Sequence, residues 1–279
     1  MPLPNLIIAG PPKTGTTSLF DWLAAHPEVC GSSKKETYYF YEHSEMESPF
    51  PNFKKDGWDG YKKYFTDCKG EPIRMEASPG YIYSKLAADK LGTLPALKAV
   101  MVMRNTADRM FSEYQFNRYK TKKFSGSFAE YLGFDGADFE GEKYEECNLS
   151  PFIHMWLEHI PKENFRIISF EDMKNDPQGL MKRLCDFLSI DTNFYESFGF
   201  EKKNETFGIR NSRIHQFALK VHRSTPRFLQ RLITPAYYFI NKESIPPISD
   251  EEVRQKEALS HKMMQAEAEL LEQFGHLYL

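Results

Sequence analysis

The first 25 residues carry the pattern that most restricts the fold. Residues 6–9 are apolar and predict one short buried strand, and a turn rich in glycine and proline follows. Residues 18–25 are then typical of the first turns of a helix. At the start of such a helix the backbone N–H groups are unpaired, and the helix dipole favours negative charge. The stretch therefore predicts a phosphate-binding loop.

The loop contains the groups that bind an anion, but not in the Walker A order. Gly10 and Gly15 have the spacing of G-x-x-x-x-G-K-[ST], whereas Thr16 stands at the lysine position and Lys13 lies inside the loop. Lys13 supplies charge, Gly15 lets the backbone approach a ligand, and residues 16–18 supply hydroxyl donors. This order predicts a contact different from that of a nucleoside triphosphate. The alternative is an ordinary turn with a surface lysine.

Length and composition favour one large α/β domain over residues 1–279. The chain is 41% apolar and 15% aromatic, enough for a sizeable core. The net charge of −3 argues against a dedicated nucleic-acid-binding protein. We find no apolar run long enough to cross a membrane, and a strand beginning near residue 5 leaves no room for a signal peptide. We expect a soluble, cytoplasmic protein, or a catalytic fragment of a longer one.

The four cysteines lie far apart in the sequence and form no C-x-x-C pair. This spacing predicts neither a zinc site nor a disulfide framework, so we expect free thiols. The cysteines are Cys30, Cys68, Cys147 and Cys185.

A second motif lies about ninety residues after the loop. Residues 97–103 form an apolar run typical of a strand buried on both faces of a parallel sheet. Arg104 follows at the carboxyl end, where open α/β sheets bind ligands, and a helix from about Thr106 carries Ser112. A guanidinium and a hydroxyl together suit a terminal phosphate. The alternative is a strand-capping arginine with a serine on the helix surface.

Together the two motifs resemble those of sulfotransferases that use 3′-phosphoadenosine 5′-phosphosulfate (PAPS). Residues 12–19, P-K-T-G-T-T-S-L, are similar to the 5′-phosphosulfate loop. Residues 104–114 are similar to the 3′-phosphate motif, with Thr106 in place of its proline. The resemblance is to the carbohydrate (heparan-sulfate-type) and bacterial members. It implies a P-loop-like three-layer α/β fold with a central parallel sheet flanked by helices, and PAPS as co-substrate with no metal expected.

The resemblance also implies roles for individual residues. Lys13 is implied to act in catalysis and in cofactor binding. Arg210 falls near the family's late nucleotide loop and is a candidate second contact to the 3′-phosphate. The implied cofactor-binding residues are Lys13, Thr14, Gly15, Thr16, Thr17, Ser18, Arg104, Ser112 and Arg210.

Glu36 is the candidate catalytic base. Lys34 and Lys35 precede it and can keep the carboxylate ionised, and three aromatic residues follow that can exclude water. The carbohydrate branch has its base in a similar context, which implies that Glu36 takes the acceptor's proton. His43 is the rival base, and a solvated charged loop is the alternative interpretation.

A third segment departs from the family pattern. Residues 76–81 are similar to the E-K-(T/S)-P-x-Y element of glycosaminoglycan sulfotransferases, but Ala77 replaces the lysine. The role of that lysine is therefore not carried over, which weakens the case for a heparan-like acceptor. Glu76, Ser78 and Tyr81 are interpreted as lining a pocket.

These observations predict in-line transfer of a sulfuryl group from PAPS to a hydroxyl or amine of a carbohydrate or small molecule. The basic stretch 210–242 suits cofactor phosphates, an anionic acceptor or weak peripheral contact with a membrane, and equally an ordinary basic helix. Two other classes stay open. A P-loop kinase needs Mg²⁺ and a lysine where Thr16 stands, and a non-catalytic nucleotide-binding protein does not need Glu36.

Overall fold

The computed structural model describes residues 3–41, 50–134, 138–200, 208–211 and 240–279, together with residues 214, 218 and 237. Its contacts divide the chain into two compact units. The first unit comprises Met1–Asn105, Asn148–Asn204 and Met264–Leu279, and the second comprises Thr106–Cys147 and Glu205–Met263. A single domain over residues 1–279 stays a prediction.

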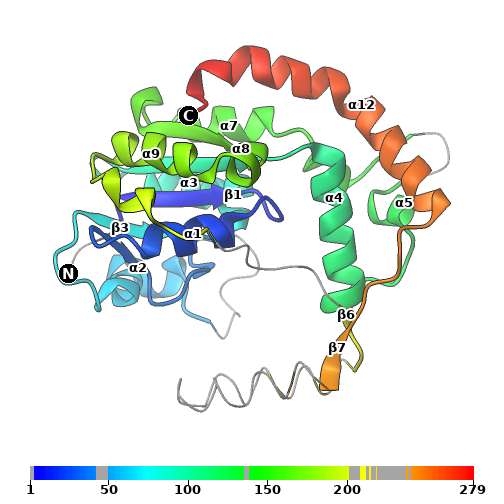
Figure 1. The fold of residues 1–279 in the computed structure, drawn as a ribbon, viewed down its shortest axis with the longest axis horizontal. Helices are drawn as coiled ribbons and strands as arrows, with labels where there is room; N and C mark the ends of the chain where they lie inside the picture. The colour runs from blue at the N-terminus through cyan, green and yellow to red at the C-terminus, as the bar shows by residue number, and fades with distance from the viewer. Residues whose placement is uncertain are drawn as a thin grey trace. The chain divides into compact units, whose positions relative to one another are not determined.

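The first unit is built on a five-stranded sheet (Figure 1). The strands are β1 (Leu6–Gly10), β2 (Val29–Gly31), β3 (Ile73–Glu76), β4 (Lys98–Met103) and β5 (Phe165–Ser169). Their order is β2-β3-β1-β4-β5, and all neighbours are parallel. The predicted central parallel sheet is confirmed.

Helical segments connect these strands. In the first unit they are α1 (Thr16–Ala24), α2 (Phe53–Lys62), η1 (Lys63–Phe65), η2 (Pro79–Tyr83), α3 (Lys85–Leu91), α7 (Ser150–Leu157), η4 (Lys162–Asn164), α8 (Phe170–Asn175), α9 (Pro177–Leu188), η5 (Asn193–Glu196) and η6 (Gly275–Leu277). The long helix α12 (Asp250–Phe274) contributes residues to both units. The start of α9 follows from sequence, because Asp176 accepts a hydrogen bond from the Gly179 N–H at 3.0 Å and proline occupies the first turn.

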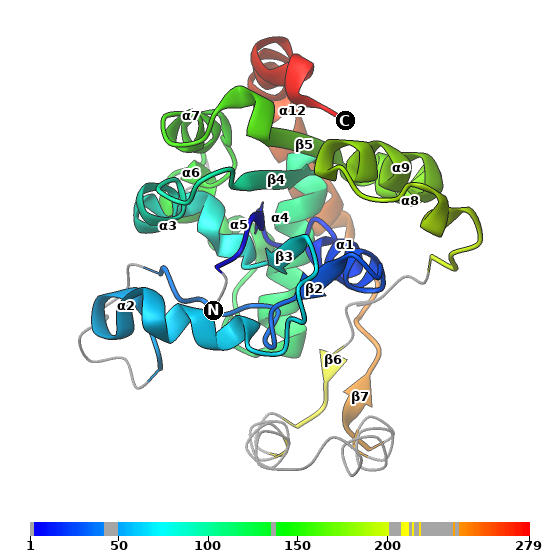
Figure 2. The ribbon, with the colours of Figure 1, turned by 90° about the vertical axis from the view of Figure 1, so that its left-hand side faces the viewer.

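Side chains alternate across the sheet and build a core on each face. On β1, Ile7 and Ala9 join one cluster with α3 and α7, whereas Leu6 and Ile8 join the other with α1 and α9. Figure 2 shows α3 and α7 on one side of the strands and α1, α8 and α9 on the other. Because both faces are covered, the central strands are apolar throughout. The three-layer α/β fold is therefore confirmed.

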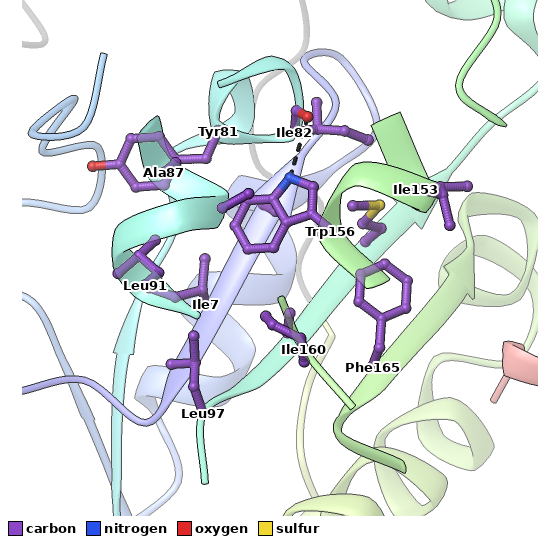
Figure 3. Close-up of a cluster of buried hydrophobic side chains, with 14 of the residues drawn as sticks. Ile7, Tyr81, Ile82, Ala87, Leu91, Leu97, Ile153, Trp156, Ile160 and Phe165 are labelled. Atoms are coloured by element: carbon purple, nitrogen blue, oxygen red, sulfur yellow. Dashed lines mark hydrogen bonds between the residues drawn. The ribbon is translucent and has the colours of Figure 1, made fainter. Parts of the chain in front are cut away.

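Trp156 of α7 fills the centre of one of these cores (Figure 3). Its side chain is fully buried, and its indole N–H donates to the Ile82 carbonyl at 3.2 Å. A buried indole N–H normally needs such a partner. This contact fixes α7 to η2, the segment that directly follows β3.

The described part of the second unit is mainly helical. Its segments are α4 (Thr106–Gln115), η3 (Phe116–Lys120), α5 (Phe128–Tyr131), α6 (Glu142–Glu145), β6 (Gly208–Ile209) and β7 (Lys242–Glu243). The two short strands pair antiparallel. Glu113 of α4 accepts hydrogen bonds from the Tyr131 hydroxyl and from Lys143 Nζ, both at 3.0 Å. These polar contacts join α4 to the two short helices that follow it.

Two of the four cysteines form a disulfide, so the expectation of free thiols is wrong for Cys30 and Cys68. They are separated by 38 positions, but their Cα atoms are 5.6 Å apart. The Ser33 N–H donates to the Tyr64 carbonyl at 2.8 Å, which brings the end of η1 beside β2. Sequence spacing does not reveal this proximity. Cys147 and Cys185 are buried free thiols, as expected.

Among the helices of the described residues, none combines the length and the apolar character needed to span a bilayer.

Candidate functional site

The phosphate loop leaves β1 through a glycine that the fold requires. Gly10 has a φ of +119°, and a Cβ there would lie 1.7 Å from the Pro79 carbonyl oxygen. Gly15, at φ +87°, is the N-cap of α1. Because glycine has no capping side chain and the first turn contains no acidic residue, the amides of that turn are available to an anion.

The side chain of Thr14 stabilises the interior of the phosphate loop. Thr14 is fully buried, and its hydroxyl donates to the Pro11 carbonyl at 2.7 Å. Lys13 has a φ of +66°, an uncommon conformation for a residue with a side chain. Such backbone outliers are concentrated at ligand sites. The helix begins at Thr16, two residues earlier than the sequence predicts.

Arg104 meets this loop at the carboxyl end of the sheet. One guanidinium nitrogen, Nη1, donates to the Lys13 carbonyl at 3.0 Å, and the guanidinium carbon lies 4.6 Å from the centroid of the Phe170 ring. A Cβ on Gly15 would lie 3.2 Å from the same ring. The loop after β1, the residue after β4 and the residue after β5 therefore pack together. Sequence analysis predicted Arg104 here and missed Phe170.

Two other predicted phosphate contacts lie in the second unit. Ser112 is half-buried on α4. Arg210 directly follows β6; its backbone N–H donates to the Asn241 carbonyl at 3.0 Å, and the residue is exposed. Because Arg104 belongs to the first unit and Ser112 to the second, joint binding of one phosphate by these two residues stays a prediction.

Glu36 lies in the loop after β2, and both of its oxygens are engaged. Lys35 Nζ lies 2.8 Å from Oε1, and the Tyr38 hydroxyl donates to Oε2. Burial raises the pKa of Glu36, but the charge of Lys35 and the hydrogen bonds from Lys35 and Tyr38 outweigh it, so the pKa lies below its ordinary value. The side chain is 34% exposed, which leaves it accessible to an acceptor. His43, the rival base, lies outside the described residues.

Residues 37–40 have no regular secondary structure, yet each backbone N–H has a side-chain acceptor. The acceptors belong to residues 76–81, the segment that we interpreted from the sequence as lining a pocket. The donor–acceptor distances are 3.3 Å for Thr37 N to Glu76 Oε1, 3.2 Å for Tyr38 N to Ser78 Oγ, 2.9 Å for Tyr39 N to Tyr81 Oη and 3.3 Å for Phe40 N to Tyr81 Oη. Glu76, Ser78 and Tyr81 are fully buried, so they support the backbone beside Glu36.

Metal-ligand geometry occurs at one place in the described ranges. Cys30, Cys68 and Glu71 have ligand atoms within 4.8 Å of one another. The two sulfurs are bonded to each other in the disulfide, so they are not thiolate ligands.

A family model for the sulfotransferase domain matches residues 3–236. The chain belongs to the sulfotransferase family. Among the relatives of this sulfotransferase domain is the membrane-associated sulfotransferase kil1 of Dictyostelium discoideum, 32% identical over 284 residues, which cover 70% of this chain and 58% of the relative. The resemblance predicted from the two motifs is confirmed.

Other relatives of this sulfotransferase domain are human enzymes named for heparan sulfate. Bifunctional heparan sulfate N-deacetylase/N-sulfotransferase 2 is 26% identical over 205 residues, covering 67% of this chain and 22% of the relative. Heparan sulfate glucosamine 3-O-sulfotransferase 6 is 26% identical over 200 residues, covering 69% and 55%. The chain thus spans less than two thirds of the length of these relatives.

The fold also matches a solved member of the family. A sulfotransferase from Alicyclobacillus acidocaldarius is 25% identical and superposes with a TM-score of 0.59, covering 85% of this chain and 99% of that one. The match extends over most of the chain, so the fold predicted from the motifs is that of a sulfotransferase.

Proposed function

We propose that this sulfotransferase moves the sulfuryl group of PAPS to a hydroxyl or amine of a carbohydrate or small molecule. The observation that carries the proposal is the grouping at one edge of the sheet. The phosphate loop follows β1, Glu36 follows β2, Arg104 follows β4 and Phe170 follows β5. In open parallel sheets this carboxyl edge is where ligands bind.

The loop supplies the donor side of the reaction. Uncapped amides at the start of α1 and the charge of Lys13 suit a dianionic phosphosulfate. As the sulfur–oxygen bond to the phosphate breaks, negative charge grows on the bridging oxygen. Positioned donors stabilise such developing charge without reorganisation. Lys13 and the loop amides are therefore assigned this role, and 3′-phosphoadenosine 5′-phosphate departs as the product.

Glu36 supplies the acceptor side. A new sulfur–oxygen or sulfur–nitrogen bond forms to the acceptor while its proton passes to the Glu36 carboxylate. The lowered pKa of Glu36 keeps the base ionised at neutral pH. Arg104, with Ser112 and Arg210 as further candidates, is assigned to the 3′-phosphate that distinguishes PAPS from ATP. Carbohydrate is the favoured acceptor class because heparan sulfate appears in the relatives' names.

Calorimetric titration tests the nucleotide. We expect 3′-phosphoadenosine 5′-phosphate to bind without Mg²⁺ and at least tenfold more tightly than ADP, because the extra phosphate gains charged hydrogen bonds. The matched titrant is ATP, with and without Mg²⁺. Preference for ATP with Mg²⁺ overturns the proposal in favour of a P-loop kinase.

Turnover of PAPS separates catalysis from binding. We expect Lys13→Ala to lose more than 90% of turnover. Glu36→Gln should lose a similar share while its affinity for the product nucleotide stays within twofold of wild type. The measurement is release of the product nucleotide in the presence of a panel of sugars and small alcohols or amines. Full turnover in Glu36→Gln removes it from the role of base.

A further inference from the structure

The segment that carries Glu36 is fixed by the side chains of a neighbouring segment. Besides the four backbone hydrogen bonds from residues 37–40, the Ala77 N–H donates to the Lys35 carbonyl at 3.2 Å. Glu36 therefore lies between two fixed points, the Lys35 carbonyl and the Thr37 N–H. Its position depends on the segment at the end of β3.

Glu76 is the acceptor on which these contacts converge. Its Oε1 accepts from the Thr37 N–H at 3.3 Å, from the Thr37 hydroxyl at 3.1 Å and from the Ser78 hydroxyl, and its Oε2 accepts from the Tyr61 hydroxyl at 3.0 Å. Three of these four donors share Oε1 and one contacts Oε2, an arrangement that suits a carboxylate acting only as acceptor. Within the described residues no lysine or arginine pairs with Glu76.

The directions of the hydroxyl hydrogens also follow from the network. The Tyr81 oxygen accepts from the Tyr39 and Phe40 N–H groups, so its own hydrogen points to Thr37 Oγ1, 2.9 Å away. The Thr37 hydroxyl then donates to Glu76. Similarly, Ser78 accepts from the loop backbone and donates to Glu76. The hydrogen bonds from Tyr81 and from Ser78 therefore both lead to the same carboxylate.

We propose that Glu76 is a positioning residue whose ionised carboxylate holds residues 37–40, and through them the candidate base Glu36, in place for proton transfer. Its consequence for turnover rests on the proposed function, whereas its consequence for the backbone does not. Protonation of Glu76 removes one acceptor site and weakens the rest, because a neutral carboxyl accepts weaker hydrogen bonds than a carboxylate. Loss of that proton fixes the loop, and gain of it loosens the loop.

The surroundings put this change near neutral pH. Burial raises the pKa of Glu76 to about 7, against hydrogen bonds from Ser78, Thr37 and Tyr61 that lower it. Four tyrosines around Glu76 have a raised pKa, caused by burial and in part by the charge of Glu76: Tyr61 of α2, Tyr64 of η1, Tyr81 of η2 and Tyr38 of the loop. Their hydroxyls stay protonated across the physiological range, so Glu76 is the group in this cluster that changes charge.

We call the hydrogen bonds that lead from residues 37–40 to Glu76 the clamp. Hydrogen exchange of the wild-type backbone tests the clamp without any assay of activity. Protection of residues 37–40 is measured between pH 5.5 and 8.5 and corrected for the intrinsic pH dependence of exchange. We expect protection to rise at least fivefold with a midpoint near pH 7. In Glu76→Gln, a permanently neutral isostere, protection should stay low at every pH. Protection that is flat in wild type overturns the proposal.

Kinetics connect the clamp to Glu36. We expect Glu76→Gln to lower turnover at least tenfold at pH 8. The loss of turnover that wild type shows as the pH falls below about 7 should be absent in this variant. Its affinity for 3′-phosphoadenosine 5′-phosphate should stay within twofold of wild type. Thr37→Val should lose turnover in the same way, and Thr37→Ser, which keeps the hydroxyl, should recover most of it. Glu71→Gln, the same change at a half-buried position before β3, is the control and should match wild type.

The two hypotheses fail in different ways. If wild type lacks turnover with PAPS but its residues 37–40 gain protection near pH 7, the proposed function fails and the clamp stands. If PAPS is turned over and Glu76→Gln keeps the wild-type pH profile, the clamp fails and the proposed function stands. If Glu76→Gln does not fold, the wild-type exchange profile and the Thr37 pair decide.

Discussion

At the scale of single residues, two carboxylates at the ends of neighbouring strands have opposite environments. Glu36 follows β2 and has Lys35 beside it, so its pKa is lowered although burial acts in the other direction. Glu76 ends β3 and pairs with no lysine or arginine among the described residues, and burial raises its pKa to about 7. Environments that separate the pKa values of two nearby acids are a common way to give them different roles. Here one is suited to accept a proton and the other to respond to pH.

The charge of Lys35 should determine the pH below which protonation of Glu36 lowers kcat/KM. In Lys35→Met the pKa of Glu36 rises, because the cation that stabilises its carboxylate is gone. The base is then protonated at a higher pH, so the limb of kcat/KM that belongs to Glu36 moves upward in pH. This limb is read in the Glu76→Gln background, because Glu76 otherwise limits activity below about pH 7. The measurement is a pH–rate profile of PAPS turnover. Lys35→Arg keeps the charge and serves as the control; an identical shift in both variants contradicts the prediction.

Glu76 should make the protein less stable as the pH rises, which is the opposite of the usual effect of a carboxyl group. Its pKa is about 7 in the folded state against an ordinary value of 4.5, so between these pH values the folded state holds a proton that the unfolded chain has released. The free energy of unfolding then falls as pH rises through this window, by up to about 3 kcal/mol.

The comparison of urea unfolding at pH 5 and pH 8 measures this contribution. From pH 5 to pH 8 the unfolding free energy should fall by more in wild type than in Glu76→Gln, because residue 76 of the variant does not titrate. Equal differences in the two proteins contradict a raised pKa. Glu71→Gln again controls for a change of carboxylate to amide.

At the scale of elements, the phosphate loop depends on the close approach of β1 to η2. Gly10 has the positive φ that glycine adopts without strain, and the carbonyl of Pro79 occupies the space of a side chain. This contact connects the loop that follows β1 to the segment that holds Glu36. A glycine of the phosphate motif is therefore also a packing residue.

Gly10→Ala should destabilise the protein by about 3 kcal/mol or more, since the backbone conformation is unfavourable for alanine and the added methyl overlaps the backbone of Pro79. Gly70→Ala is the matched control: Gly70 has a similar φ of +113° with nothing within 4 Å of a Cβ. It should lose only the conformational part, about 1 kcal/mol. Thermal and urea unfolding measure both, and equal losses contradict the packing argument.

At the scale of the whole molecule, chemistry is concentrated where parallel strands end, and a covalent link secures one edge. The disulfide joins β2, an edge strand, to the segment after η1. β2 leads directly into the loop of Glu36. Disulfides persist in oxidising compartments and are uncommon in the cytosol. The cytoplasmic location stays a prediction, and the redox state of this bond in cells is the observation that bears on it.

Reduction of the disulfide should lower the free energy of unfolding by about 2–4 kcal/mol, because the bond closes a loop of 38 positions and constrains the unfolded chain. The measurement is urea unfolding with and without a reductant. The double variant Cys30→Ala/Cys68→Ala is the control, and reductant should not affect it. Equal effects of reductant on both proteins assign the change to something other than this bond.

The sequence by itself determined the architecture and predicted which residues stand at the ends of two strands. Apolar runs at residues 6–9 and 97–103 specify buried parallel strands, and glycines, a lysine and an arginine follow them at once in the chain. Such local patterns predict the phosphate loop, Arg104 and Glu36 because each depends on neighbours in sequence. The sulfotransferase family follows from the same residues.

Only the tertiary structure decided how distant segments support that chemistry. Phe170 reaches Arg104 because β5 lies beside β4, and Cys30 bonds to Cys68 because η1 returns to β2. Glu76 contacts the loop of Glu36 because β3 lies next to β2, so the segment interpreted as lining a pocket also accepts hydrogen bonds from residues 37–40. These contacts depend on strand order and on the direction of side chains. Neither can be inferred from local patterns in a single sequence.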